Sequence, residues 1–399
     1  MQTTKKTNNN IQSPTNFYCS QKFWWLTVDI SKIQTLSCCA ATPAKINLSW
    51  LRENPGKLFN TPELQHERKL MLSDVKVDSC SATCWNAEQQ GLTSRRLSSE
   101  SQLRTHTDIN ASPRILHIII GNDCNMTCVY CCKQYSSAWT QDILTHGSYV
   151  GVDTQDDRFV LNNTDRVLLK LSQKDISNSD NTQLLFAEIN RLAASSNLEE
   201  ITITGGEPFL YLGLRNLVRA IPSHIKVNIW SGLGVDTTRF ARELSLLPRQ
   251  VNVCISAEST DKLYEFVRYG NTWDRLQRNI AVLTEQQVTY SFYATISNLT
   301  LSGLPDFINW AGDTPVVYSP CTDPEFLSIH VLDNESKERI FNLLDKFPPS
   351  VQSMITTAMP NIPSVKQRLN FKNYLTTFAH RRSLELTMFP QSLINWATK

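Results

Sequence analysis

Residues 115–131 read ILHIIIGNDCNMTCVYC, and this stretch decides the fold expected for the chain. Its apolar run predicts a buried strand, after which come three cysteines spaced C-x3-C-x2-C: Cys124, Cys128 and Cys131. A second strand-like run, 200–204, is followed directly by a Gly-Gly-Glu-Pro segment, 205–208. Three thiolates on one short loop can hold three irons of a four-iron cluster and leave the fourth iron open. A glycine pair at a strand end lets the backbone approach a ligand closely.

Zinc is the alternative metal for these cysteines. A closed structural zinc site takes four protein ligands, typically from short C-x2-4-C pairs. The triplet has no obvious fourth ligand nearby, although the adjacent Cys132 is a candidate. The Gly-Gly-Glu-Pro segment makes the zinc interpretation less favourable than the cluster interpretation.

Both segments carry a resemblance to a known family. Residues 124–131, with aromatic Tyr130 before the third cysteine, resemble the cluster loop of the radical S-adenosylmethionine (SAM) superfamily. Residues 205–208 resemble that superfamily's second motif, which receives the methionyl amino group of SAM. The resemblance implies a [4Fe-4S] cluster on the three cysteines. It also implies SAM binding by the second motif, whose residues are Gly205, Gly206, Glu207 and Pro208.

Three further residues are candidates for SAM binding. Ser256 and Glu258 follow a strand-like run, where similar enzymes place a Ser-x-Asp near the SAM carboxylate and ribose. Glutamate is a departure from that pattern, and an acid here can equally be a solvated loop residue or a structural partner. Arg268 is a candidate to pair with the SAM carboxylate through both guanidinium nitrogens, or to form a surface ion pair.

Strand-like runs and amphipathic helical patterns alternate from Arg114 onward. Strands are expected at 114–120, 200–204, 225–230, 251–256, 288–296 and 315–318. Helices are expected at 183–196, 211–221, 236–247, 261–286, 303–311 and 334–346. Such alternation predicts a parallel sheet covered by helices, with the active site at the carboxyl ends of the strands. The expected fold class is α/β: a partial (β/α)6 barrel with a small N-terminal cysteine-rich module and a C-terminal helical segment.

Four segments are expected along the chain. They are a disordered tail at 1–16, an auxiliary cluster module at 17–100, a radical SAM core at 112–330 and a C-terminal helical extension at 331–399. Residues 94–110 are polar and form the expected linker. Residues 136–182 are also polar and interrupt the first β-α unit as a long loop.

A second group of cysteines precedes the cluster loop: Cys19, Cys38, Cys39, Cys80 and Cys84. Four of the five can complete a closed thiolate site for zinc or a second iron–sulfur cluster. Polar neighbours such as Ser37, Ser79 and Ser81 argue against ordinary core cysteines. This region resembles the auxiliary-cluster module of twitch radical SAM proteins, relatives of the SPASM group. The resemblance implies a second [4Fe-4S] cluster on Cys19, Cys80, Cys84 and one of the adjacent Cys38 and Cys39. Spacing does not settle which of the two is the ligand, and we favour Cys38.

Composition limits the other function classes. The 399 residues carry a formal net charge of +2, which gives no electrostatic footprint for nucleic acid. No signal peptide or run of transmembrane length is visible, so we expect a cytoplasmic protein with no membrane partner. Eleven cysteines without an export signal indicate metal or cluster ligation rather than disulfides.

These observations predict a radical SAM enzyme that cleaves SAM reductively and starts hydrogen abstraction from an unidentified substrate. A peptide or protein is the preferred substrate, and a nucleotide, nucleobase or small metabolite is the first alternative. A non-catalytic zinc or cluster-binding interaction protein is the second alternative. Reductive cleavage also implies an electron donor such as flavodoxin or ferredoxin.

Overall fold

The computed structural model describes residues 17–89, 94–97, 107–154, 156–167, 169, 179–194, 197–248 and 250–398. The expected tail at 1–16 and much of the expected linker lie outside these residues. The chain divides into two compact units. The first holds Met1–Ile119 and Asp180–Ile201, and the second holds Ile120–Ser179 and Thr202–Lys399. The four segments expected from the sequence stay predictions.

The first unit contains a small mixed sheet. Its strands are β1 (Trp25–Asp29), β2 (Gln34–Leu36), β3 (Ala44–Lys45) and β4 (Ile115–Ile119). Strand β1 pairs in parallel with β4 and antiparallel with β2, which pairs antiparallel with β3. Because β1 lies between two neighbours and is almost wholly buried, its residues WLTVD are mostly apolar or β-branched.

Helices complete the first unit. They are η1 (Ser20–Phe23), α1 (Leu48–Glu53), η2 (Leu58–Asn60), α2 (Pro62–Leu72), η3 (Asp78–Cys80), η4 (Ser81–Trp85), α3 (Asn86–Gln89), η5 (Arg95–Leu97) and α7 (Asp180–Ala193). Helix α2 has a standard start: the Thr61 hydroxyl accepts a hydrogen bond from the Leu64 amide, and Pro62 occupies the first turn.

The second unit contains a parallel sheet. Its strands are β6 (Lys226–Ser231), β7 (Val251–Ser256), β8 (Thr289–Ile296) and β9 (Val316–Pro320), paired in that order. Strand β5 (Glu200–Thr204) contributes its last three residues to this unit. Since parallel strands run in one direction, the polar residues after their carboxyl ends share one edge of the sheet.

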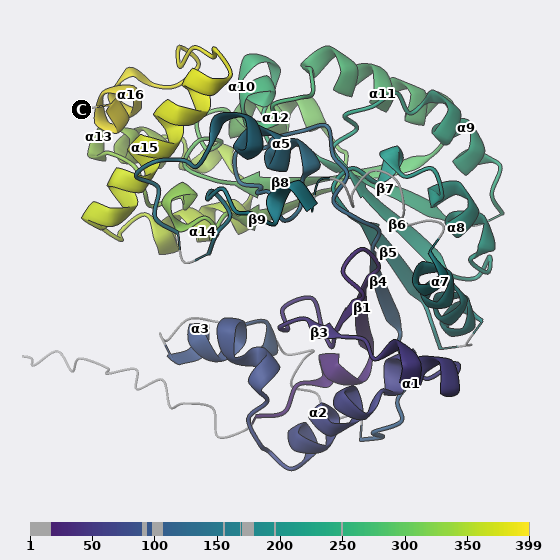
Figure 1. Ribbon diagram of the computed structural model, residues 1–399. Helices are drawn as coiled ribbons and strands as arrows, with labels where there is room; N and C mark the ends of the chain where they lie inside the picture. Colours follow the sequence, from purple (N-terminus) through teal and green to yellow (C-terminus); the bar gives the residue numbers. More distant parts are fainter. Residues whose placement is uncertain are drawn as a thin grey trace, which may run out of the picture. The chain divides into compact units, whose positions relative to one another are not determined.

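Helices follow the strands of the second unit, and Figure 1 shows α9 and α11 lying outside β6 and β7. The helices are α5 (Ser137–His146), η6 (Pro208–Leu210), α8 (Leu214–Ala220), α9 (Thr238–Ser245), α10 (Asp261–Val267), α11 (Trp273–Glu285), α12 (Leu304–Ala311), η7 (Glu325–Leu327), α13 (Asn334–Phe341), η8 (Leu344–Lys346), α14 (Pro349–Ala358), α15 (Val365–Arg381) and α16 (Gln391–Thr398). The mixed α/β class, with a parallel sheet consistent with a partial (β/α) barrel and a helical C-terminus, confirms the expected fold class.

Two expectations about local structure are wrong. The single helix expected over 261–286 is two helices, α10 and α11, because Gly270 between them has a φ of +105°, outside helical geometry. The polar stretch at 136–182 is not a loop throughout, since it begins with α5. The Ser136 hydroxyl accepts a hydrogen bond from the Trp139 amide at the start of α5, which is a standard helix N-cap.

The core beneath α5 is aromatic. Trp139 packs against Tyr149, Phe159 and Tyr374, with ring centroids 5.6, 5.7 and 6.4 Å away. Tyr374 lies on α15, so this helix buries part of the segment that follows the cysteine loop.

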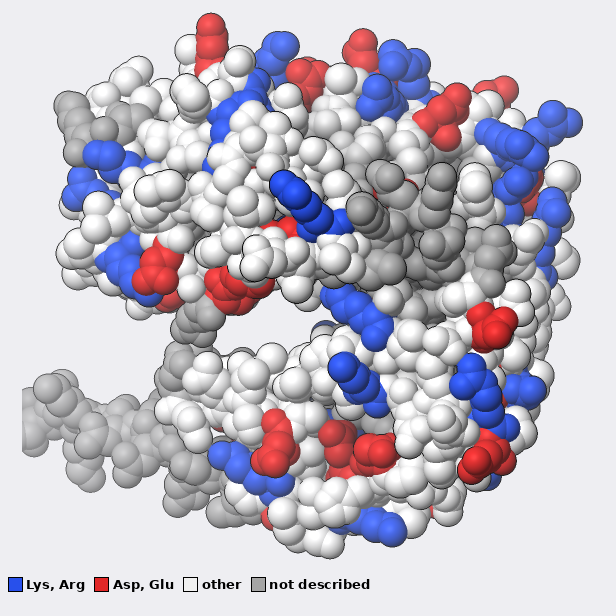
Figure 2. Space-filling model, in the orientation of Figure 1, with Lys and Arg blue, Asp and Glu red and all other residues white. Residues whose placement is uncertain are grey.

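On the face shown in Figure 2, positive and negative side chains are interspersed. Within the described residues, no helix is both long and apolar enough to cross a membrane.

Candidate active site

The cysteine loop lies in the second unit and is fixed by hydrogen bonds from α5. The Cys124 amide donates to the Ser137 hydroxyl (3.0 Å), and the Trp139 indole donates to the Cys128 carbonyl (3.0 Å). Cys124 and Cys128 are buried and Cys131 is partly buried, all in contact with a small apolar cluster. These hydrogen bonds fix the backbone of the loop at Cys124 and Cys128 against α5.

Burial raises the pKa of the thiols of Cys124, Cys128 and Cys131. The charges of Cys132, Cys128 and Cys124 raise the pKa of Cys131 further, because neighbouring thiolates repel one another. Metal ligands must be deprotonated. The positive charge of a bound cation or cluster relieves the repulsion between the resulting thiolates. Among the described residues, no three His, Cys, Asp or Glu side chains form a site for a single metal ion. A four-iron cluster is less demanding, since each cysteine ligates a different iron.

Cys132 was the candidate fourth ligand for zinc. It is buried, and its thiol interacts with Arg158, Asp156 and Asp323. Three cysteines of one loop thus fit a cluster with an open iron better than a closed four-cysteine zinc site.

The glycine loop packs directly on the cysteine loop. The Gly206 amide donates to the Gly121 carbonyl (2.9 Å), and the Glu207 amide donates to the Asp123 carbonyl (2.7 Å). A Cβ atom on Gly206 would lie 2.4 Å from the Asp123 carbonyl oxygen, and one on Gly205 would lie 2.9 Å from the Gly121 carbonyl oxygen. The two glycines therefore allow one loop backbone to approach the other, a different reason from the ligand approach expected from the sequence.

Glu207 is buried, and its carboxylate is fully engaged by the protein. It accepts hydrogen bonds from the Ser231 hydroxyl (2.6 Å), the Gly232 amide (3.0 Å) and the Phe209 amide (3.2 Å). Burial raises its pKa, while these donors oppose the rise. Pro208 begins the short helix η6. The carboxylate thus ties the glycine loop to the end of β6. Its expected role toward a SAM ammonium group stays a prediction.

Glu258 and Arg268 form a buried ion pair behind the cysteine loop. The Arg268 Nη2 and Nε atoms donate to the two Glu258 carboxylate oxygens at 2.6 and 3.0 Å. The Tyr130 hydroxyl also donates to Glu258 (2.6 Å), and Arg268 Nη1 lies 3.8 Å from the Cys128 sulfur. Ser256 ends β7 beside Tyr293 of β8 and is only partly buried. The structure thus brings Glu258 and Arg268 to the cysteine loop, and their expected contacts with SAM stay predictions.

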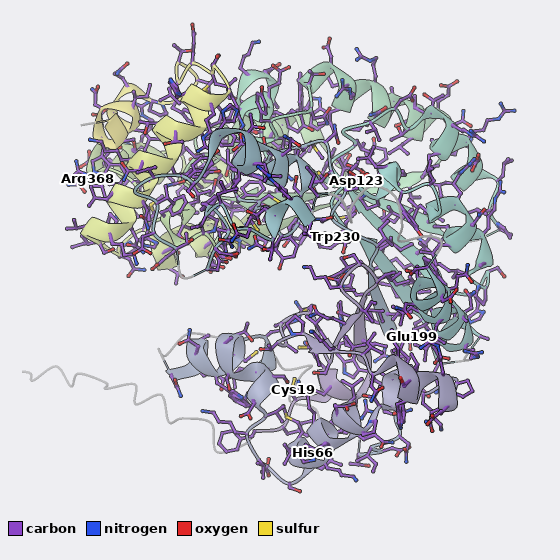
Figure 3. All side chains as sticks on the ribbon, viewed as in Figure 1. Cys19, His66, Asp123, Glu199, Trp230 and Arg368 are labelled. Carbon is purple, nitrogen blue, oxygen red and sulfur yellow. The ribbon has the colours of Figure 1, made fainter. Side chains whose placement is uncertain are left out.

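Sequence reasoning missed several residues that position this site. Tyr130, Ser137 and Ser231 make the contacts that fix Glu258, Cys124 and Glu207. Tyr130 was noted only as an aromatic of the family motif. Glu258 lies 128 residues further along the chain, so the sequence carries no signal that joins the two residues. Figure 3 labels Asp123 and Trp230, which mark the cysteine loop and the end of β6.

The second group of cysteines lies wholly in the first unit. Cys19, Cys38, Cys80 and Cys84 are all buried, whereas Cys39 is partly exposed. Figure 3 labels Cys19 among the helices of this unit. Burial raises the pKa of Cys19 to about 12 and that of Cys80 to about 11, and the charge of Cys38 contributes to both. Four thiols from three chain segments are therefore electrostatically coupled.

Lys22 gathers these three segments, and sequence reasoning missed it. Its ammonium group, 1% exposed, donates to the Ser37 hydroxyl (2.5 Å) and the Ser79 hydroxyl (2.8 Å), which directly precede Cys38 and Cys80. It also pairs with Glu67 at 2.8 Å. Lys22 itself follows Cys19 by three residues. A buried cation beside four cysteines suits a site that becomes negative when the thiols are deprotonated.

Comparisons with known proteins agree with this geometry. Residues 118–311 match the model of the Radical SAM superfamily. GTP 3′,8-cyclase from Bradyrhizobium diazoefficiens is 26% identical over 138 residues, covering 32% of this chain and 40% of that protein. The Mesorhizobium japonicum GTP 3′,8-cyclase is 25% identical, covering 32% of this chain and 41% of that protein. The chain thus spans about 40% of the length of the curated relatives it matches.

Two solved structures show a low similarity. Native anSMEcpe with bound AdoMet is 16% identical, with a TM-score of 0.39, over 58% of this chain and 59% of that chain. SuiB of Streptococcus suis bound to S-adenosylmethionine is 14% identical, with a TM-score of 0.33, over 85% of this chain and 69% of that chain.

The segment matched by the family model contains the three cysteines, the glycine loop and the Glu258–Arg268 pair. This segment, just under half of the chain, is thus similar to the radical SAM superfamily of enzymes.

Proposed function

We propose that the protein binds a [4Fe-4S] cluster through Cys124, Cys128 and Cys131 and cleaves SAM reductively. The observation that carries this proposal is the direct junction between the cysteine loop and the glycine loop, made by the amides of Gly206 and Glu207. When bound, the cluster supplies one electron and an open iron to SAM, whose cleavage yields methionine and a 5′-deoxyadenosyl radical that abstracts hydrogen from substrate. A low-potential donor such as flavodoxin or ferredoxin supplies the electron.

The protein's own residues position the reactants. The α5 contacts fix the backbone at Cys124 and Cys128, which with Cys131 would hold the cluster. The Glu207 carboxylate holds the glycine loop against the end of β6, and this loop would bind SAM. Ser256, at the carboxyl end of β7, is the candidate for contacts with the SAM ribose.

A peptide or protein is the first candidate substrate, on the resemblance of the chain to twitch and SPASM-like radical SAM proteins. A nucleotide is the second candidate, because the curated relatives are GTP 3′,8-cyclases. That match covers 32% of this chain and 40% of that protein.

We also propose that Cys19, Cys38, Cys80 and Cys84 bind a second [4Fe-4S] cluster. The support is their common burial and coupling, and the Lys22 ammonium that joins their three segments. A closed cluster of this kind would accept an electron from the substrate radical.

An assay of SAM cleavage tests the proposal. Anaerobically reconstituted protein, reduced with dithionite, should convert SAM to equal amounts of 5′-deoxyadenosine and methionine. Cys128→Ala should not. A folded, iron-loaded protein that leaves SAM intact would favour the non-catalytic, cluster-binding alternative, and a colourless zinc-loaded protein would favour the zinc alternative. Peptide and nucleotide fractions of a cell extract can then be compared by how strongly each increases 5′-deoxyadenosine formation.

A further inference from the structure

Arg268 reaches a cysteine ligand because the helix breaks where it does. It is the residue after α10, and the turn through Gly270 separates it from α11. A Cβ atom on Gly270 would lie 2.4 Å from the Asn125 carbonyl oxygen, so this turn packs closely on the cysteine loop. The Thr127 amide donates to the Tyr269 carbonyl (2.7 Å), and the Val129 amide donates to the Val267 carbonyl (2.9 Å). Hydrogen bonds on both sides of Arg268 therefore fix it against Cys128.

The guanidinium group of Arg268 has one free edge, and that edge faces sulfur. Nε and Nη2 are used by the two oxygens of Glu258, while Nη1 points to the Cys128 sulfur at 3.8 Å. The edge made by Nε and Nη2 is thus occupied by a carboxylate of the protein itself. The remaining nitrogen, Nη1, contacts the cysteine sulfur, which favours a role of Arg268 toward the cysteine over one toward SAM.

The surroundings of the pair leave its charges little screened by solvent. Glu258 is 0% exposed and Arg268 is 7% exposed. The guanidinium carbon also lies 4.8 Å from the centroid of the Tyr130 ring, whose hydroxyl donates to Glu258. The pair is neutral overall, but its positive end touches the sulfur and its negative end points away. In a poorly solvated site such a dipole acts strongly on a neighbouring charge.

We propose that Arg268 is a positioning residue that sets the reduction potential of the SAM-binding cluster through Cys128, with Glu258 balancing its charge. This inference rests on the proposed function. Reduction adds one electron, taken from a low-potential donor of the flavodoxin or ferredoxin class, and breaks no bond. The added negative charge is stabilised by an N–H donor and a positive charge at a ligand sulfur, so the Arg268 contact raises the potential. The Glu258 carboxylate limits that rise and keeps the cluster a strong reductant.

The test is the reduction potential of the SAM-binding cluster, measured without SAM by electron paramagnetic resonance (EPR) titration. The double variant Arg268→Gln/Glu258→Gln removes both charges together, so no unpaired charge remains buried. Its potential should fall below that of the wild type. Glu258→Gln alone leaves the arginine charge unbalanced, and its potential should rise. Arg268→Lys, which keeps the charge but not the fork of donors, should give a value between the wild type and the double variant.

Arg382→Gln is the matched control. Arg382 is also buried and paired with an acid, Asp142, and it touches the cysteine loop through the Thr127 hydroxyl (3.1 Å). It contacts no cysteine sulfur in the described structure, so its removal should shift the potential less than the double variant does.

The outcomes separate this inference from the proposed function. Opposite shifts in the double variant and in Glu258→Gln, with normal iron content, support it. Unchanged potentials with weaker SAM binding would assign Arg268 to the SAM carboxylate and overturn it. Shifts equal to that of Arg382→Gln would also overturn it, since any buried charge would then suffice. If the double variant does not load iron, the directions of the potential shifts in Glu258→Gln and Arg268→Lys decide whether the inference holds. A wild type that binds no cluster at Cys124, Cys128 and Cys131 would instead remove the proposed function.

Discussion

Gly206 shows how a single residue can join two functional loops. The space for its side chain is occupied by the Asp123 backbone, with a carbonyl oxygen 2.4 Å from the position of a Cβ atom. A backbone atom cannot move aside as the end of a flexible side chain can. Any substitution must therefore displace the cysteine loop, the glycine loop or both.

Gly206→Ala should accordingly lower the rate of SAM cleavage by roughly 100-fold, the cost of misplacing reacting groups by about 1 Å. Because the clash falls on the cysteine loop, the iron content of the SAM-binding cluster should also drop. Iron analysis and a 5′-deoxyadenosine assay check both effects. Gly147→Ala is the control: its φ of +80° makes alanine strained, but nothing lies within 4 Å of the added Cβ. Normal SAM cleavage by Gly206→Ala would contradict the close packing of the glycine loop on the cysteine loop.

Glu207→Gln tests the carboxylate that ties the glycine loop to β6. An amide group cannot accept from all three donors, so one buried hydrogen bond is lost and the unfolding free energy should fall by about 1–3 kcal/mol. Thermal unfolding measured by circular dichroism gives the change. Glu199→Gln removes an exposed partner of Arg114 and should cost less than about 1 kcal/mol. Equal effects of the two substitutions would show that Glu207 has no special structural role.

The positions of the motif residues directly after strands were predictable from the sequence, but several of their contacts were not. The cysteine spacing and the glycine pair follow from local order alone. The Glu258–Arg268 pair joins residues ten positions apart through the turn after α10, and its partner Tyr130 comes from a separate loop. Reasoning from spacing places such side chains near a site, while tertiary contacts decide what they touch.

At the scale of elements, the apolar strand runs were reliable guides. Strands β5 and β7 coincide with the expected ranges, because buried parallel strands need continuous apolar residues. The break between α10 and α11 was missed. Helix α10 ends at Val267, with Arg268 as its C-cap outside helical geometry, and Gly270 follows with a φ of +105°. Lys22 was missed because a lysine in a polar-looking segment gives no sign of burial.

Lys22→Met should disrupt the first unit's cysteine site. The change leaves Glu67 without its cation and removes the hydrogen bonds that join the segments of Cys38 and Cys80. We expect the protein to lose about half of its iron, by the four-cysteine rule for a cubane cluster, while SAM cleavage persists. Iron analysis and the 5′-deoxyadenosine assay distinguish the two clusters.

Lys32→Met is the matched control for this substitution. Lys32 is partly exposed and pairs with Asp29 at 3.6 Å, so its loss should leave the iron content unchanged. Full iron content in Lys22→Met as well would mean that Lys22 does not support a metal site.

Strand β4 contains a histidine that makes stability depend on pH. Burial lowers the pKa of His117 from its ordinary value of 6.5 to about 4, so the unfolded chain takes up a proton in a range where the folded chain does not. The stabilisation is complete above pH 6.5 and is lost as the pH falls from there toward 4, by up to about 3 kcal/mol. His117→Gln should flatten the dependence of the melting temperature on pH in this window. His66→Gln, at an exposed position of α2, should not.

At the scale of the whole molecule, the chain carries two sets of cysteines in two separate compact units. The first unit holds Cys19, Cys38, Cys80 and Cys84, and the second holds Cys124, Cys128 and Cys131. Each set has a buried cation near its sulfurs, Lys22 in one and Arg268 in the other. The account therefore predicts two clusters that can be removed independently.

Replacing Cys124, Cys128 and Cys131 together by alanine should remove about half of roughly eight irons, following the rule of four irons per cubane cluster. The remaining cluster should be insensitive to SAM. A triple variant that keeps full iron would contradict the assignment of the second unit, and a wild type that never exceeds four irons would contradict that of the first.

The response of the reduced cluster to SAM tests the central claim most directly. An EPR spectrum of the dithionite-reduced wild type, recorded before and after SAM is added, reports whether one iron is open to that ligand. The account predicts a signal that changes shape on addition of SAM, and no such change in the Cys124/Cys128/Cys131 triple variant. A fully loaded wild-type protein whose signal is the same with and without SAM would contradict it.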